Sequence, residues 1–291
     1  KGANFVKKLK RCGHHVEVLT GFPNYPFGKL YDGYKMHFWK KEKMDGIPII
    51  RTALFPSHSR SKIGRIFNYF SFTISSTITA LFKMRNNFDL IYVYHPPITV
   101  GITALVLKLF WKTPYIYEIQ DLWPDTLKAT GMIKNNFFIK IIEKLSNLIY
   151  NLADSIIVIS PGFKKRLVKK GINSKKINII YNSCDEKNIY PREKNSILMN
   201  ELKLANKFNI FFAGNMGKAQ SLVSVLDAAL LVSKELPDVR IIFIGDGVES
   251  NYLKQYAKDL NLKNIIFMDA VGLDKIGEIL SLADILLVHL K

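Results

Sequence analysis

Short, unbroken apolar runs alternate with helical stretches along most of the chain, and this alternation limits the folds open to it. Continuous apolar strands separated by helices are typical of a parallel sheet that is covered on both faces. The expected strands are 16–20, 47–52, 89–94, 115–119, 155–160, 177–181, 208–213, 239–244, 264–268 and 285–288. The expected helices are 2–11, 62–84, 98–111, 136–152, 161–170, 220–235, 249–260 and 273–281. The fold class is therefore α/β.

The pattern lapses after Asn182, where a polar stretch contains a proline, and it resumes near residue 207. We expect two doubly wound, Rossmann-like domains, 1–186 and 207–291, joined by a linker at 187–206. Ligands of such sheets bind beyond the carboxyl ends of the strands, so the cleft between the domains is the expected site. Both ends look cut, since the chain opens on a helix without its strand and stops inside an apolar run.

Basic residues are concentrated in the first two thirds of the chain. The net charge is +18, and residues 1–200 hold 32 of the 42 Lys and Arg but 13 of the 24 Asp and Glu. Such a basic part suits nucleic acid, an anionic lipid surface or phosphorylated substrates. No recognisable RNA- or DNA-binding module accompanies the charge, so we expect no nucleic-acid partner. The two cysteines, Cys12 and Cys184, have no metal-site spacing and suggest a reducing compartment.

Residues 46–88 contain no acidic residue and include a long helical pattern. Apolar residues at helical spacing share one face of that helix. They are Ile63, Phe67, Phe70, Ile74, Ile78 and Leu81. The segment falls short of the ~20 mainly apolar residues of a membrane span. Two compatible interpretations remain: this face packs on the sheet, or the region with its basic entry at Arg60, Lys62 and Arg65 rests on an anionic membrane.

Polar residues cluster in the loops that follow several strands. The loop "GNMGKAQS" follows strand 208–213. Its glycines and Lys218 suit either a diphosphate at a helix N-terminus or a glycine turn with a solvent-exposed lysine. In "IGDGVES", Glu249 is expected to cap the next helix, whereas Asp246 is undecided between a cap and a ligand contact. No spacing of His and carboxylates indicates a metal site.

The loop after strand 115–119 gathers Glu118, Gln120, Asp121 and Asp125 around a Trp-Pro turn in an otherwise basic region. Asp121 is the candidate catalytic residue. Glu118 is expected to end the strand, and Asp125 to cap the turn that follows.

Four segments together resemble glycosyltransferase family 4, which has the GT-B fold. They are "GHHVEVLTGFPNYPFGKLYDGY", "YEIQDLWPDTLKATGMI", "IIVISPGFKKRLVKKGINSKKINIIYNSCD" and "FFAGNMGKAQSL". The nearest likeness is to bacterial enzymes of capsule, O-antigen or colanic-acid assembly, including N-acetyl-fucosamine transferases. The resemblance implies retaining transfer of a sugar from a nucleotide-diphosphate donor, expected to be a UDP-sugar, to a saccharide acceptor on a lipid. It implies no metal and no cofactor, an acceptor-binding first domain, a donor-binding second domain, and a cytoplasmic location on the inner face of the membrane.

The resemblance also assigns roles to residues of this chain. Asp121 matches the acid near the transferred sugar. The donor-binding positions are Gly214, Asn215, Lys218, Gly245, Asp246, Gly247 and Val271. The acceptor-side positions are Gly2, Asn24, Tyr25, His95, Gln120 and Trp123. Two residues depart from the family pattern: Asn215 replaces a common Arg, and Gln120 replaces His or Arg, so it can bind a hydroxyl but cannot carry a proton.

Two family features are absent from the 291 residues. These are the glycine-rich loop after the first strand, of which at most Lys1-Gly2 remains, and a Glu-x7-Glu segment that would lie beyond Lys291. We therefore expect the chain as given to be inactive. The alternative functions are a two-domain sugar-binding protein without catalysis and a nucleotide-sugar epimerase of the same fold.

Overall fold

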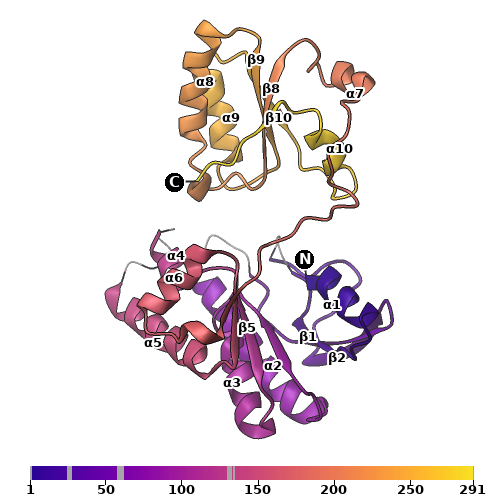
Figure 1. Ribbon diagram of the computed structural model, residues 1–291, viewed down its shortest axis with the longest axis vertical. Coiled ribbons are helices and arrows are strands. Elements are labelled where there is room, and N and C mark those ends of the chain that lie inside the picture. The colour runs from indigo at the N-terminus through magenta and orange to yellow at the C-terminus, as the bar shows by residue number, and fades with distance from the viewer. Residues whose placement is uncertain (1, 25–27, 58–61, 130–132, 134, 291) are drawn as a thin grey trace. The chain divides into compact units, whose positions relative to one another are not determined.

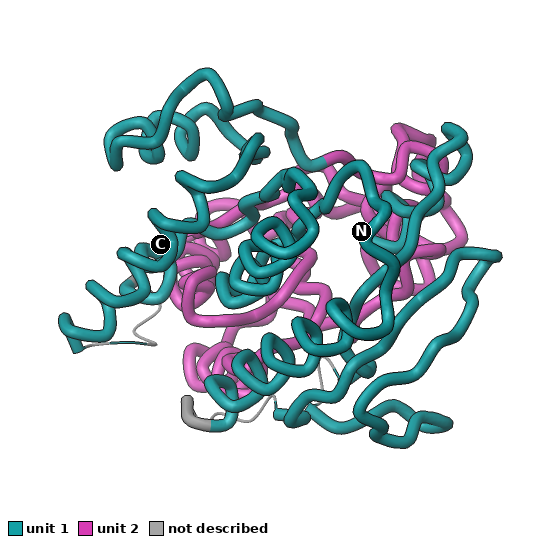
Figure 2. Tube along the Cα trace, turned by 90° about the horizontal axis from the view of Figure 1, so that it is seen from below, with its two compact units in different colours: residues 1–182 teal, residues 183–291 magenta. Residues whose placement is uncertain are grey.

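The computed structural model describes residues 2–24, 28–57, 62–129, 133 and 135–290. The chain divides into two compact units, Lys1–Asn182 and Ser183–Lys291, which are drawn in different colours in Figure 2. The boundary lies four residues before the expected end of the first domain, at 186. Each unit is an α/β structure and is described by itself.

Unit 1 holds a parallel sheet of four strands, ordered β4-β5-β6-β7, and a second sheet of three strands, ordered β1-β3-β2. Figure 1 shows α2 and α3 lying side by side in this unit. The elements are α1 (Gly2–Arg11), β1 (Val18–Gly21), β2 (Trp39–Met44), β3 (Ile47–Thr52), α2 (Lys62–Lys83), β4 (Ile91–Tyr94), α3 (Val100–Trp111), β5 (Tyr115–Ile119), α4 (Asp125–Ala129), α5 (Asn136–Leu152), β6 (Ser155–Val158), α6 (Pro161–Lys169), the 3₁₀ turn η1 (Ser174–Lys176) and β7 (Ile177–Ile179). Tyr117, Ile119 and Ile149 are fully buried at the centre of the main core.

Unit 2 holds one parallel sheet, ordered β10-β9-β8-β11, with an apolar core on each face. The elements are α7 (Ser196–Glu201), β8 (Phe208–Ala213), the 3₁₀ turn η2 (Lys218–Gln220), α8 (Val223–Glu235), β9 (Val239–Ile244), α9 (Ser250–Asp259), β10 (Ile265–Met268), α10 (Ile276–Leu280) and β11 (Ile285–Leu286). In Figure 1, α8 and α9 cover one face of this sheet, and α7 and α10 lie on the other side. Leu204, from the expected linker, is fully buried in the second core.

The predicted strands 47–52, 115–119, 208–213 and 239–244 are confirmed at both ends. A strand that the pattern did not predict is β2, which pairs antiparallel with β3. Asp45 and Gly46 join these strands with positive φ angles of 53° and 71°. Two-residue hairpin turns need this geometry, and an Asp-Gly pair is their usual sequence signal, so the hairpin was readable from the sequence.

Helix α2 faces the opposite way from the packed face that we expected. Phe67, Phe70, Ile74 and Ile78 are exposed. The helix instead buries Thr73, Ser75, Ser76, Thr79 and Ala80 against its own unit. The expectation that the apolar face packs on the sheet is therefore wrong. The side chain of Ile63 lies outside the described residues.

A Leu-Ala-Asp sequence precedes a strand in each unit, at 152–154 and at 282–284. The Asp154 carboxylate accepts hydrogen bonds from the Tyr115 backbone N–H at 2.9 Å and from Lys108 Nζ at 2.8 Å. In return, the Asp154 N–H donates to the Tyr115 carbonyl. Asp284 repeats the arrangement with the backbone of Asn209 and the side chain of Lys194. Each aspartate thus fixes the start of a neighbouring strand.

These contacts change the pKa values of both aspartates. Partial burial alone would raise the pKa of Asp154, but the hydrogen bonds from Lys108 and Tyr115 outweigh it and lower the pKa below its ordinary value of 3.8. The pKa of Asp284 is lowered in the same way, because the hydrogen bonds from Asn209 and Lys194 outweigh the effect of burial. A carboxyl group with a lowered pKa stabilises the folded state above its unfolded pKa, and that contribution is lost as the pH falls through the folded pKa.

We expect Asp154→Ala to lower the free energy of unfolding by about 1 kcal/mol at neutral pH, because it removes the acceptor of the Tyr115 N–H. Asp154→Asn, which keeps an acceptor oxygen, is the matched control and is expected to lose less. Urea unfolding followed by circular dichroism measures both. The difference from the wild type should shrink as the pH falls below 3.8, the ordinary value for this carboxyl group; a difference that stays constant with pH would contradict the assignment.

Candidate functional site

Near the carboxyl end of β5 lies a buried carboxylate that accepts hydrogen bonds from its neighbours. Glu118 is 8% exposed, and its carboxylate accepts hydrogen bonds from the Tyr92 hydroxyl and from Gln120 Nε2. Gln120 Oε1 in turn accepts a hydrogen bond from Asn182 Nδ2 at 3.2 Å. Burial, together with Glu118, raises the pKa of Tyr92, so this hydroxyl keeps its proton. Gln120 therefore joins a network that links β5 to the end of the unit, and Glu118 does more than end the strand.

Asp121 differs from Glu118 because its carboxylate has no hydrogen-bond or ion-pair partner among the described residues. Its carbonyl accepts a hydrogen bond from the Trp123 N–H at 3.1 Å. Burial raises the pKa of Asp121 above its ordinary value of 3.8. A half-buried carboxylate without a partner at the carboxyl end of a parallel strand is available to a ligand, and Asp121 stays the candidate catalytic residue.

His95, after β4, and Trp123, within this loop, are both buried in the core. His95 is fully buried, with its ring centroid 5.7 Å from that of Trp123 and 5.9 Å from that of Tyr117. Burial lowers the pKa of His95 to about 3, so the ring is neutral at physiological pH. Trp123 is 8% exposed and also contacts Tyr69 of α2. Both residues were expected to face an acceptor, but their packing assigns them to support of the loop.

The expectation that Asp125 caps a turn is also revised. Asp125 is the first residue of α4, and its carboxylate lies 2.7 Å from Arg166 Nε and 3.3 Å from Lys170 Nζ of the α6 region. Burial acts to raise its pKa, but the hydrogen bond from Arg166 and the charge of Lys170 lower it. The carboxylate thus ties α4 to α6.

The remaining acceptor-side residues lie apart from this loop in the chain. Gly2 is exposed at the start of α1. Asn24 follows β1, and its Nδ2 donates to the Phe22 carbonyl at 2.9 Å. Tyr25 lies outside the described residues.

In unit 2, the loops after β8 and β9 pack against each other through their backbones. The Met216 N–H donates to the Asp246 carbonyl at 2.9 Å, and the Glu249 N–H donates to the Met216 carbonyl at 3.0 Å. A Cβ on Gly245 would lie 2.2 Å from the Gly214 carbonyl oxygen, and a Cβ on Gly247 would lie 2.4 Å from that of Met216. Only glycine permits this approach. Three predicted donor-side glycines, Gly214, Gly245 and Gly247, therefore lie in the same pair of packed loops.

Lys218 and Asn215 are exposed on this pair of loops, but the helix expected behind them begins later. Lys218 lies in the 3₁₀ turn η2, and α8 starts at Val223 rather than at residue 220. The Gly217 N–H already donates to Gln220 Oε1 at 3.2 Å. The loop therefore does not place a helix N-terminus behind a diphosphate site. It presents an exposed lysine, Lys218, beside glycine backbone.

The other predicted donor-side residues have separate local roles. Asp246 is exposed, and its carboxylate accepts a hydrogen bond from the Gly247 N–H at 2.7 Å. Glu249 is the N-cap residue of α9, but its side chain makes no capping hydrogen bond, so the expected cap is absent. Val271 packs against the core on one face of the sheet.

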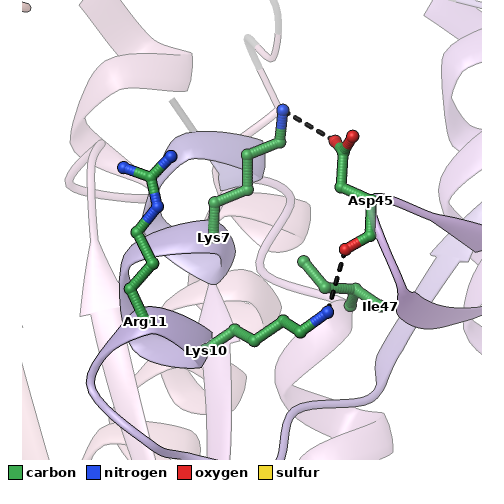
Figure 3. Close-up of a pocket in the computed structure, with 5 residues that line it drawn as sticks. All are labelled: Lys7, Lys10, Arg11, Asp45 and Ile47. Atoms are coloured by element: carbon green, nitrogen blue, oxygen red, sulfur yellow. Dashed lines mark hydrogen bonds and ion pairs between the residues drawn. The ribbon is translucent and has the colours of Figure 1, made fainter.

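A basic pocket that the sequence did not suggest lies between α1 and the β2–β3 hairpin. It is lined by Lys7, Lys10, Arg11, Asp45 and Ile47, and its volume is about 380 Å³ (Figure 3). Lys7 Nζ lies 2.7 Å from the Asp45 carboxylate, and Lys10 Nζ donates to the Asp45 carbonyl at 3.0 Å. The hydrogen bond from Lys7 lowers the pKa of Asp45. None of the predicted site residues lines this pocket.

Two kinds of feature are absent from the described residues. No cluster of three or more His, Cys, Asp or Glu residues is arranged to hold a metal ion. No helix in the described ranges is both long enough and apolar enough to cross a membrane.

Comparison with known proteins gives two family matches in order along the chain. Residues 3–183 match the model of the glycosyl transferase 4-like domain. Residues 195–290 match the model of glycosyl transferases group 1. The gap between the matches, 184–194, overlaps the first part of the expected linker, 187–206.

Individual proteins are similar over different shares of the chain. WcaI of Escherichia coli K12, named as a colanic acid biosynthesis glycosyl transferase, is 24% identical over 98% of this chain and 71% of its own length. A Campylobacter jejuni transferase, whose name places N-acetylgalactosamine on a diphospho-undecaprenol-linked saccharide, is 28% identical over 49% of this chain and 37% of its own. The aligned part of the chain thus covers 71% of the length of WcaI and 37% of the length of the Campylobacter jejuni transferase.

Solved structures show the fold. Anabaena HepE, crystallised with UDP and glucose, superposes with a TM-score of 0.62 at 17% identity, over 94% of this chain and 73% of its own. The architecture is GT-B, with two Rossmann-like domains, as predicted. With a family model matched over residues 3–183, the chain belongs to the glycosyl transferase 4-like family.

Proposed function

We propose that this chain contains the donor- and acceptor-binding parts of a retaining glycosyltransferase of bacterial surface polysaccharide synthesis. The donor is a nucleotide-diphosphate sugar, with UDP as the expected nucleotide, and the acceptor is a saccharide on a lipid. The observation that carries the proposal is the glycine-lined pair of loops at the carboxyl ends of β8 and β9, beside the exposed Lys218. The relatives support the choice of substrates, because one is named for a diphospho-undecaprenol-linked acceptor and HepE was crystallised with UDP.

On the donor side, backbone without Cβ atoms lets a ligand approach closely, and Lys218 supplies positive charge. Gly214 and Asn215 are exposed, whereas Gly217 is buried, with the Asn215 Nδ2 packed where a Cβ would lie. In the proposed reaction, Lys218 stabilises the negative charge that develops on the departing diphosphate. Because Asn215 is neutral, Lys218 is the cation of this loop on which that stabilisation depends.

On the acceptor side, Asp121 is the acid proposed to act at the transferred sugar. The bond from the anomeric carbon to the diphosphate oxygen breaks, the acceptor hydroxyl oxygen bonds to that carbon, and the hydroxyl proton passes to the departing diphosphate. Asp121 orients the sugar hydroxyls or stabilises positive charge on the ring. Gln120 moves no proton, and its side chain is held by Glu118 and Asn182, so its proposed role is to position the Asp121 loop.

The test of the function is to incubate the full-length protein with a panel of nucleotide sugars and a lipid-linked saccharide and to follow transfer by mass spectrometry. Transfer with release of the nucleoside diphosphate supports the proposal. An epimerised nucleotide sugar, or tight binding of a free sugar with no nucleotide requirement, would support one of the alternative functions instead.

We expect Asp121→Asn to reduce turnover of the full-length protein by roughly a hundredfold, with little change in donor binding, because it removes charge only at the reacting sugar. The wild type should lose activity as the pH falls through a value above 3.8, since burial raises the pKa of Asp121. Initial rates across pH, with donor affinity from calorimetry, provide the measurement. Unchanged turnover would remove Asp121 from the site.

We expect Gly247→Ala to lower the free energy of unfolding by about 1 to 3 kcal/mol, because the added Cβ overlaps the Met216 backbone. UDP affinity should fall with it if the loop pair holds the donor. Gly162→Ala is the matched control, since its Cβ would have Ser160 Oγ at 3.7 Å as its nearest neighbour. Urea unfolding and calorimetry with UDP separate the two effects; UDP binding that survives a displaced loop would argue against this donor site.

A further inference from the structure

A histidine that the sequence did not single out, His289, contacts the donor-side loop of unit 2. It lies shortly after β11, and β11 pairs in parallel with β8, so the segments that follow both strands lie at the same edge of the sheet. The ring Nδ1 of His289 is 2.6 Å from the Gln220 carbonyl oxygen. Gln220 ends the 3₁₀ turn η2, which begins at Lys218. The imidazole is therefore in direct contact with the turn that carries the exposed lysine.

Gln220 joins this histidine to the backbone of the glycine loop. The Gln220 carbonyl contacts the ring of His289, while the Gln220 side-chain Oε1 accepts a hydrogen bond from the Gly217 N–H at 3.2 Å. Leu287, which lies between β11 and the histidine, donates its N–H to the Phe211 carbonyl of β8 at 2.7 Å. The ring is thus held at a fixed place relative to the loop after β8.

The contact with Gln220 decides which ring nitrogen carries the proton of the neutral imidazole. A carbonyl oxygen only accepts hydrogen bonds, so Nδ1 must be the donor, and Nε2 is then the unprotonated nitrogen. Nε2 has no hydrogen-bond partner among the described residues, and it is not one of their buried unpaired atoms, so it is open to solvent. Such a nitrogen can take up a proton from the solvent and then donate a hydrogen bond to a ligand.

The charges near the ring favour an anionic ligand. The charged residues on the loops that pack together here are Lys218, Asp246 and Glu249. The Asp246 carboxylate already accepts the Gly247 N–H, and none of the ion pairs between described residues includes His289. A protonated imidazole would add a second positive charge close to Lys218 without a protein carboxylate to balance it. An anionic oxygen of a ligand would be its charge-assisted partner.

We propose that protonated His289 binds the diphosphate of the donor together with Lys218. The Nδ1–H stays on the Gln220 carbonyl, and the Nε2–H, whose proton comes from the solvent, donates to a diphosphate oxygen. The histidine thereby supplies, from outside the loop, a positive charge that the neutral Asn215 does not provide. This inference rests on the proposed function, because that function places a diphosphate beside η2, and it adds that donor binding takes up a proton.

Calorimetry with the full-length protein tests this role. UDP and uridine, which differ by the diphosphate, are titrated near neutral pH into the wild type and into His289→Gln, in buffers with different heats of ionisation. We expect the wild type to take up more protons per bound UDP than the variant. The variant should bind UDP roughly tenfold more weakly, because a charge-assisted hydrogen bond is lost. Uridine affinity should be equal in the two proteins.

His289→Arg separates the positive charge from the uptake of a proton. Arginine is always charged and presents several donors in one plane, so this variant should bind UDP more tightly than His289→Gln without taking up more protons. His15→Gln, at an exposed histidine of unit 1, is the matched control and should change neither quantity. Circular dichroism and urea unfolding check that each variant folds.

The possible failures are distinguishable. Equal UDP affinity and equal proton uptake in the wild type and His289→Gln would overturn this inference and leave the proposed function in place. An equal loss of UDP and uridine affinity in the folded variant would also overturn it, because the ring would then only support the loop. NMR of the labelled ring nitrogens gives a separate check, and a neutral ring protonated on Nε2 would contradict the contact with Gln220. A wild type that binds no nucleoside diphosphate would contradict the proposed function and this inference together.

Discussion

The hydrogen bonds of Asp154 fix the register of β5 against β6, and the candidate site depends on that register. The carboxylate and the N–H of this residue bind both backbone groups of Tyr115, the first residue of β5. Parallel strands that start together end at the same edge, so the loops after them meet there. Asp284 performs the same task for β8 and β11 in the second unit. One local device thus sets the loop edge of both units.

At that edge, burial separates two carboxylates that are close in sequence. Glu118 is buried and already satisfied by Tyr92 and Gln120, so it stabilises the loop. Asp121 is half-buried, its pKa is raised by burial, and it has no partner among the described side chains. Gln120 stands next to Asp121 where the family pattern has His or Arg. Its amide bridges Glu118 and Asn182, and this bridge needs a hydrogen-bond donor and an acceptor on the same side chain.

The second unit achieves its candidate site with backbone rather than side chains. Gly245 and Gly247 bring two loops into direct contact, and Met216 is fully buried between them. In the first unit, α2 also packs through small residues: its Ser and Thr side chains pack inward through hydrogen bonds, and its large apolar residues remain exposed. Both arrangements place small residues where backbones approach and leave the neighbouring surface free to bind.

Much of the fold follows from the amino-acid pattern, since a parallel strand buried on both faces must be a continuous apolar run, and β3, β5, β8 and β9 are such runs. The sequence also selects the glycines after β8 and β9, and Asp121 after β5, as candidate site residues, because ligands of parallel sheets bind at those loop positions. The Asp45-Gly46 hairpin carried a readable signal that the strand pattern overlooked. By contrast, the outward face of α2, the burial of His95, the contact of Glu118 with Tyr92 and the partners of Asp125 depend on residues far away in the chain. Helical periodicity shows that one face is apolar, but the direction of that face depends on which α2 hydroxyls find partners on α3 and at the Ala53 carbonyl just after β3. Those contacts exist only after folding.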